Sequence, residues 1–91
     1  MLRGKVIIKQ QECEGKSIFT GVESCMTQGF KRMFGSEAEA IAFTALALIL
    51  ETYPDNADYI QSFVYQLEDM EIKFWCINDE DHITYLLPSE Y

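Results

Sequence analysis

The chain is poor in the residues and motifs that most enzymes use. It has one histidine, one tryptophan and two prolines among 91 residues. It contains no glycine-rich phosphate loop and none of the short motifs that mark hydrolase or metalloprotease sites. Its three cysteines lack the close Cys-x-x-Cys spacing of zinc and redox sites, and their odd number predicts reduced thiols. We therefore expect neither catalysis nor a cofactor or bound metal.

Basic residues are also scarce, above all after residue 32. Residues 1–32 hold six basic and three acidic residues, whereas residues 33–91 hold Lys73 as their one basic residue and twelve acidic ones. The total charge is −8. Such a chain repels the nucleic-acid backbone and is attracted to basic protein surfaces. The alternative is that the acidity only keeps a hydrophobic small protein soluble.

No hydrophobic run is long enough for a membrane span. The longest apolar stretch, 40–50, is interrupted only by Thr44 and falls short of the roughly 18 residues that a spanning helix needs. The first nine residues do not resemble a signal peptide, so we expect a cytoplasmic protein. Hydrophobic residues make up 48% of the chain, which predicts one folded domain over 1–91.

The first third of the chain predicts a β-hairpin. Residues 5–10 and 17–22 are rich in β-branched and aromatic residues, and Gly15 breaks the chain between them. A hairpin over 4–23 is therefore expected. Residues 24–35 fit either a short helix or an ordered loop, and Lys31 and Arg32 make it the most basic spot in the chain.

Two helices are predicted in the middle of the chain. The first covers 36–52, where Ser36 and Glu39 have the spacing of a capping box and Pro54 ends the helix. It is apolar around most of its circumference, so a partner subunit would help to cover it. The second covers 56–69, where the apolar residues recur at helical spacing: Ile60, Phe63, Val64 and Leu67.

The last third predicts two more strands. Residues 71–77 and 82–87 read as a strand pair around an acidic turn. The expected order is therefore ββααββ. The simplest α+β architecture for this order is a four-stranded antiparallel sheet with both helices on one face.

The acidic second half supplies the candidate partner-binding residues. On the predicted second helix, the face opposite the apolar one carries Asp58, Gln61, Tyr65, Glu68 and Asp69. The predicted turn adds Asp79, Glu80 and Asp81. Carboxylates spaced on a rigid frame can imitate a row of phosphates and occupy a basic nucleic-acid groove of another protein. Tyr65 would serve as an interface anchor.

We therefore expect a non-catalytic interaction domain, in particular a small acidic inhibitor of a nuclease or another nucleic-acid-binding protein. Counter-defence proteins of phages and mobile elements belong to this physical class. One alternative is a homo-oligomeric structural or regulatory subunit, such as a homodimer through helix 36–52. Another is a minimal enzyme that uses Cys76 or His82. A metal site at 79–82 and a nucleic-acid patch at 30–34 are weaker interpretations, because a solvated turn and a packed loop explain these residues equally well.

Overall fold

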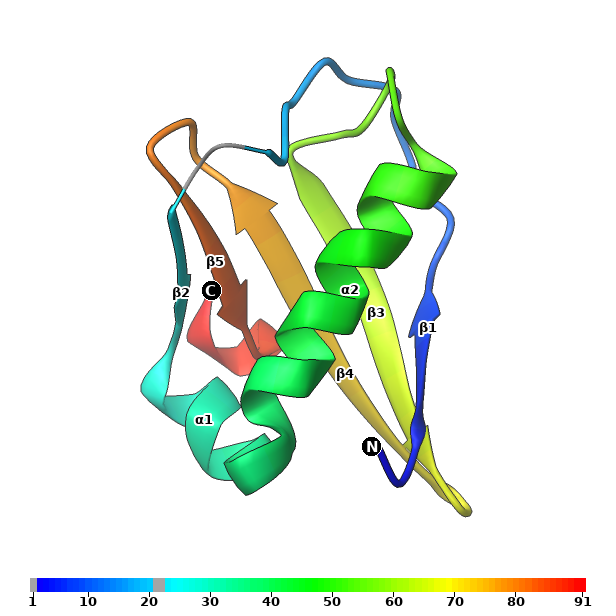
Figure 1. Cartoon of the computed structure of the whole chain (residues 1–91), viewed down its shortest axis with the longest axis vertical. Coiled ribbons are helices and arrows are strands. Elements are labelled where there is room, and N and C mark those ends of the chain that lie inside the picture. Colours follow the sequence, from blue (N-terminus) through cyan, green and yellow to red (C-terminus); the bar gives the residue numbers. More distant parts are fainter. Residues whose placement is uncertain (1, 21–22) are drawn as a thin grey trace.

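The computed structural model describes residues 2–20 and 23–91, and in them one mixed β-sheet and one long helix dominate (Figure 1). The strands are β1 (Lys5–Ile8), β2 (Glu23–Met26), β3 (Ile60–Leu67), β4 (Met70–Asn78) and β5 (His82–Leu86). The α-helices are α1 (Gln28–Phe34) and α2 (Ala38–Thr52), and two short 3-10 helices are η1 (Gly35–Glu37) and η2 (Pro88–Glu90). The α+β class is therefore confirmed, whereas the predicted ββααββ order with a four-stranded antiparallel sheet is wrong.

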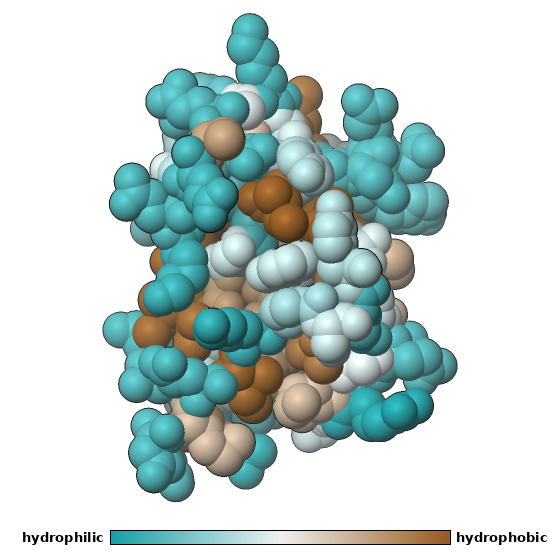
Figure 2. Space-filling model, turned by 180° about the vertical axis from the view of Figure 1, so that it is seen from behind, coloured by the Kyte–Doolittle hydropathy of each residue, from teal (hydrophilic) through white to brown (hydrophobic). Residues whose placement is uncertain are grey.

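The sheet has the strand order β1-β3-β4-β5-β2. All neighbours are antiparallel except β2 and β5, which are parallel. Helix α2 crosses one face of the sheet, and α1 lies beside its lower end (Figure 1). The other face carries no helix in the described part of the chain. Figure 2 shows pale and hydrophobic side chains in the middle of that open face, with hydrophilic ones around them.

The predicted hairpin over 4–23 is wrong. Strand β1 pairs with β3, with Val6 opposite Tyr65, so its partner comes more than fifty residues later in the sequence. Residues 17–20 form no strand, and the rest of the second predicted strand, 21–22, lies outside the described residues. Residues 24–35, for which helix and loop were both open, contribute the end of β2 and the short helix α1.

The predicted second helix, 56–69, is also wrong, because most of it is the strand β3. Its apolar residues fit a helical spacing, but they are β-branched or aromatic, which favours a strand. In the strand, alternate side chains point to the same face, and Gln61, Phe63 and Tyr65 are all buried under the helices. Val64 points to the open face and is buried there as well.

The first predicted helix and the last two strands are confirmed. Helix α2 covers 38–52 and ends at Tyr53, directly before Pro54. The predicted capping box does not form: Ser36 belongs to η1, and no side chain caps the start of α2. Strands β4 and β5 pair across the turn 79–81, as predicted.

A cluster of aromatic rings holds α1 on the sheet, whereas α2 packs there through small and aliphatic residues. Phe30 and Phe34 of α1 lie edge-on to each other with ring centroids 4.8 Å apart, and each also packs edge-on against Phe74 of β4. Phe63 of β3 stacks on Phe74 at 5.0 Å. Each buried ring removes a large apolar area from water, which a domain of this size needs for stability.

The helical segment Gln28–Thr52 is long and apolar enough to cross a membrane by length and composition alone. It is not one straight helix, however. The chain turns at Gly35, whose φ of 56° lies in the left-handed region, and η1 separates α1 from α2. Buried residues of both helices belong to the core, among them Phe30 and Ile41. This segment is therefore built as a bent pair of core helices.

Candidate protein-binding surface

The structure does not gather the predicted partner-binding residues on one helix face. Gln61 and Tyr65 are only 1% and 2% exposed, because they point from β3 into the core. Glu68 and Asp69 form the turn between β3 and β4, whereas the turn 79–81 lies at the opposite end of β4. The expected acidic face with a tyrosine anchor therefore does not exist.

Tyr65 instead fixes the N-terminal strand. Its hydroxyl accepts a hydrogen bond from the Gly4 backbone N–H at 2.8 Å and donates to Glu37 Oε1 at 3.4 Å. Glu37 also accepts from the backbone N–H of Arg3 at 3.0 Å. This bond from the Arg3 backbone is the main reason why the pKa of Glu37 lies below its usual value. The tyrosine thus joins the chain's start to the residues before α2.

Gln61 has a comparable structural task at the other end of β3. Its side-chain amide donates to Gln11 Oε1 at 2.8 Å and to the Asp58 carbonyl at 3.0 Å. Gln11 in turn accepts from the Asp58 backbone N–H and donates to the Asn56 carbonyl. The Gln61 Nε2 is thus satisfied, whereas its Oε1 is buried without a hydrogen-bond partner among the described residues. The two glutamines therefore tie the loop 9–20 to the loop 53–59.

Further bonds complete this end of the molecule. The backbone N–H groups of Gly15 and Ser17 donate to the carbonyls of Asn56 and Ala57. The side chain of Asn78 donates to the Ile18 carbonyl at 2.6 Å. Three segments far apart in sequence are thus joined by hydrogen bonds at one end of the molecule, which lies at the top of Figure 1.

This end carries almost the whole net charge of the molecule. We define the acidic end as residues 9–20, Glu23, 51–59 and 78–82. Its nine carboxylates are those of Glu12, Glu14, Glu23, Glu51, Asp55, Asp58, Asp79, Glu80 and Asp81. It has two lysines, Lys9 and Lys16, so its formal charge is −7 of the total −8. The remainder of the chain is nearly neutral.

The turn 79–81 belongs to the acidic end, but its three carboxylates differ in role. Asp79 Oδ1 accepts from the backbone N–H groups of Asp81 and His82, so it shapes the turn. Asn78 Oδ1 accepts from the N–H of Glu80, whose φ is 81°. Glu80 and Asp81 are exposed and make no side-chain bond within the described residues. These two are therefore the carboxylates that the turn presents to a partner.

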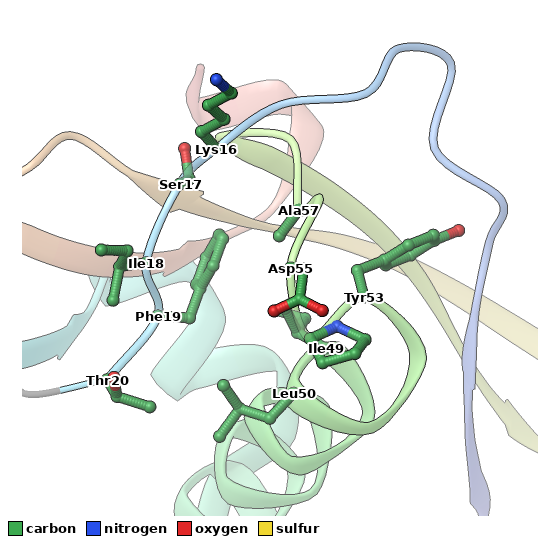
Figure 3. Close-up of a pocket in the computed structure, with 11 residues that line it drawn as sticks. Lys16, Ser17, Ile18, Phe19, Thr20, Ile49, Leu50, Tyr53, Asp55 and Ala57 are labelled. Carbon is green, nitrogen blue, oxygen red and sulfur yellow. The ribbon is translucent and has the colours of Figure 1, made fainter.

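Apolar side chains stand exposed among these charges. Ile18 is 68% exposed, Tyr59 48% and Leu50 39%. Ile18 and Leu50 border a hollow of about 420 Å³ between the loop and the end of α2, and Lys16 points its ammonium away from it (Figure 3). Tyr59 does not border this hollow but a separate one beside Trp75. Ile18 and Leu50 therefore form the apolar patch, and charged residues around it give the polar rim that is usual at a protein interface.

The structure separates the residues of the alternative enzymatic hypothesis. Cys76 points into the core with Tyr85, its partner across the strands, and burial raises the pKa of its thiol. His82 is exposed on the opposite face of the sheet. Because the two side chains lie on different faces, Cys76 and His82 do not form a nucleophile–base pair.

The structure also bears on the two weaker interpretations, the metal site at 79–82 and the nucleic-acid patch at 30–34. Among residues 2–20 and 23–91, no three side chains of His, Cys, Asp or Glu are grouped so that they could hold a metal ion. Phe30 and Phe34 pack in the core, while Lys31 and Arg32 are exposed beside them. The rings pack inward and the charges are solvated, as the packed-loop interpretation expected, but the segment is the helix α1 and not a loop.

The acidic end was missed because it depends on contacts distant in sequence. The sequence does indicate that Glu12, Glu14, Asp55 and Glu80 lie in polar connections. Nothing in it says that these connections share one end, since that follows from the pairing of β1 with β3 and of β2 with β5. Comparisons with protein-family models, with curated proteins and with solved structures give no match for this chain.

Proposed function

We propose that this chain is a non-catalytic interaction domain whose acidic end docks on a basic surface of a partner protein. The observation that carries the proposal is the concentration of −7 charges at one end of a nearly neutral frame. An acidic surface of this kind attracts a basic partner over a distance of about a Debye length and speeds association.

The partner class follows from the same charge. A basic surface that could complement the −7 charge of the acidic end is typical of proteins that bind nucleic acid, because such proteins must neutralise a row of phosphates. A domain that occupies such a surface competes with the nucleic acid. We therefore propose an inhibitor of a nuclease or another nucleic-acid-binding protein, of the kind found in counter-defence by mobile elements.

Rigidity supports this proposal. The loops of the acidic end are fixed by Gln11, Gln61 and Asn78, so few side chains and little backbone need to be ordered on binding. Ile18, Tyr59 and Leu50 supply exposed apolar area in the same region. Charge then governs the rate of association, and the apolar contacts govern how long the complex lasts.

The test begins with capture of partners from the native host by the tagged domain, identified by mass spectrometry. The captured protein is then bound to labelled DNA or RNA, and the domain is added. The proposal predicts that the domain displaces the nucleic acid. A partner that binds no nucleic acid, or one that binds the domain and nucleic acid simultaneously, would refute the inhibitor assignment.

A further inference from the structure

A second surface lies between α2 and the sheet edge formed by β2, and Glu23 is the residue that it shares with the acidic end. Strand β2 and helix α2 border an apolar hollow of about 230 Å³ there. Strand β2 lines it with Ser24, Cys25 and Met26, helix α2 with Glu39, Ala42, Phe43 and Leu46, and β5 with Tyr85. The hollow has the size to accept one large apolar side chain, and an apolar side chain of that size stands at its rim.

That side chain is Phe43, which is 75% exposed although it belongs to the central turn of α2. A phenylalanine so exposed leaves a large apolar area in water, which is costly unless something covers it. Helix α2 buries its other face in the core through Ile41, Ala45 and Ile49. Nothing in the described part of this chain covers Phe43.

The edge of the sheet beside this hollow is also open. In the strand order, β2 has β5 as its single neighbour, so its outer backbone groups lack a strand partner within the described residues. The other edge strand, β1, is flanked by Lys5 and Lys9, and charged lysines discourage pairing at an edge. Strand β2 has no lysine, and Cys25 near its middle is exposed.

Charges of opposite sign stand at the two ends of this edge. Glu23 begins β2 next to His82 and the turn 79–81. At the other end, β2 leads through Thr27 into α1, which exposes Lys31 and Arg32. The Glu90 carboxylate lies there too, on Thr27 and Gly29, and leaves one positive charge in excess. A twofold axis at right angles to β2 would set the acidic start of one strand against the basic end of another. This edge is therefore electrostatically complementary to a second copy of itself.

We propose that two copies of this chain form a twofold-symmetric dimer in which their β2 edges run antiparallel and each Phe43 enters the hollow of the partner. The dimer leaves the opposite part of each acidic end free, including Glu12, Glu14 and Asp58. It therefore does not depend on the proposed inhibitor function, and either inference can fail without the other.

Sedimentation velocity and light scattering on the full chain at micromolar concentrations test the proposal. We expect a dimer that Phe43→Ser weakens by about a hundredfold or more, since two large side chains lose their burial in each dimer. Met70→Ser, which alters a 54% exposed methionine at the start of β4, should leave the dimer unchanged. Circular dichroism checks that both variants fold. A monomeric wild-type chain, or a dimer indifferent to Phe43→Ser, would overturn the proposal.

Cysteine cross-linking and exchange of the charges at Glu23 and Lys31 test where the twofold axis of the dimer lies. A short bis-maleimide should join two chains through Cys25, so Cys25→Ser abolishes the product and Cys13→Ser retains it. Lys31→Glu and Glu23→Lys should each weaken the dimer by about threefold to tenfold, and their combination in one chain should restore it. Cross-linking that persists in Cys25→Ser would overturn the antiparallel β2 arrangement, as would additive losses in the double variant.

Discussion

At the residue scale, several polar side chains that resemble surface features in the sequence are structural ties. Tyr65, Gln61 and Asn78 are buried, and each holds together segments distant in sequence. Their hydrogen bonds are made inside the protein, where loss of one partner leaves the other unsatisfied. Such residues stabilise the frame on which the exposed carboxylates stand.

Removal of the Tyr65 hydroxyl measures how much its hydrogen bonds contribute to the stability of the fold. In Tyr65→Phe the Gly4 N–H and the Glu37 carboxylate lose a partner, so we expect the free energy of unfolding to fall by about 1 kcal/mol in urea titration. Tyr59→Phe is the comparison variant: among the described residues its hydroxyl meets only the Tyr91 side chain, the ring is 48% exposed, and its change should be smaller. Equal losses in the two variants would show that the Tyr65 hydroxyl is not a tie.

Glu90 provides the corresponding tie for the C-terminus. Its carboxylate accepts from Thr27 Oγ1 at 2.6 Å and from the backbone N–H groups of Gly29 and Leu87. The bond from Thr27, followed by that from Leu87, lowers the pKa of Glu90 below its usual value of 4.5. Because the pKa of Glu90 is lower in the folded than in the unfolded protein, its carboxylate stabilises the fold at any pH above the unfolded-state pKa. This stabilisation is lost as the pH falls through the folded-state pKa.

Thermal unfolding of Glu90→Gln across acidic pH tests this assignment. We expect the variant to be less stable than the parent at neutral pH, and its stability to fall less between about pH 5 and about pH 3. Glu71→Gln, in an exposed part of β4, should follow the parent curve. A variant that keeps the full acid sensitivity of the parent would contradict the role of Glu90.

At the element scale, sequence periodicity identified α2, β4 and β5 but misread β3. Ile60, Phe63, Val64 and Leu67 satisfy a helical spacing, and the same residues satisfy a strand that is buried on both faces. In β3, Phe63 packs under the helices while Val64 is buried on the open face, so strict alternation of apolar and polar residues is lost. The β-branched and aromatic content was the better signal there.

The junction between α1 and α2 depends on one glycine. Gly35 has φ 56°, and a Cβ there would meet no atom within 4 Å, so only backbone conformation restricts the position. We expect Gly35→Ala to lower the free energy of unfolding by about 1 kcal/mol in urea titration. Gly35→Asn should cost as much, because the Gly35 ψ of −129° lies outside the left-handed helical well that asparagine tolerates. An alanine variant as stable as the parent would mean that α1 and α2 meet differently.

At the scale of the whole molecule, the fold sorts charge that the sequence leaves dispersed. The sequence predicts an α+β domain and a surplus of carboxylates in its second half. It does not predict the parallel pairing of β2 with β5 or the pairing of β1 with β3, because both join residues far apart along the chain. These pairings bring Glu12, Glu14 and Asp55 to the same end as Asp81.

The central claim, that the acidic end and not the total charge recognises the partner, is tested most directly by the association rate of two matched variants. Glu80→Lys/Asp81→Lys and Glu68→Lys/Asp69→Lys make the same charge change in turns at opposite ends of β4. Each pair also includes one glutamate of positive φ, so the backbone effect is comparable. With the captured partner at low salt, we predict that the first variant associates about tenfold or more slowly, while the second stays close to the parent rate. Equal slowing of both variants, or no slowing of the first, would contradict the account.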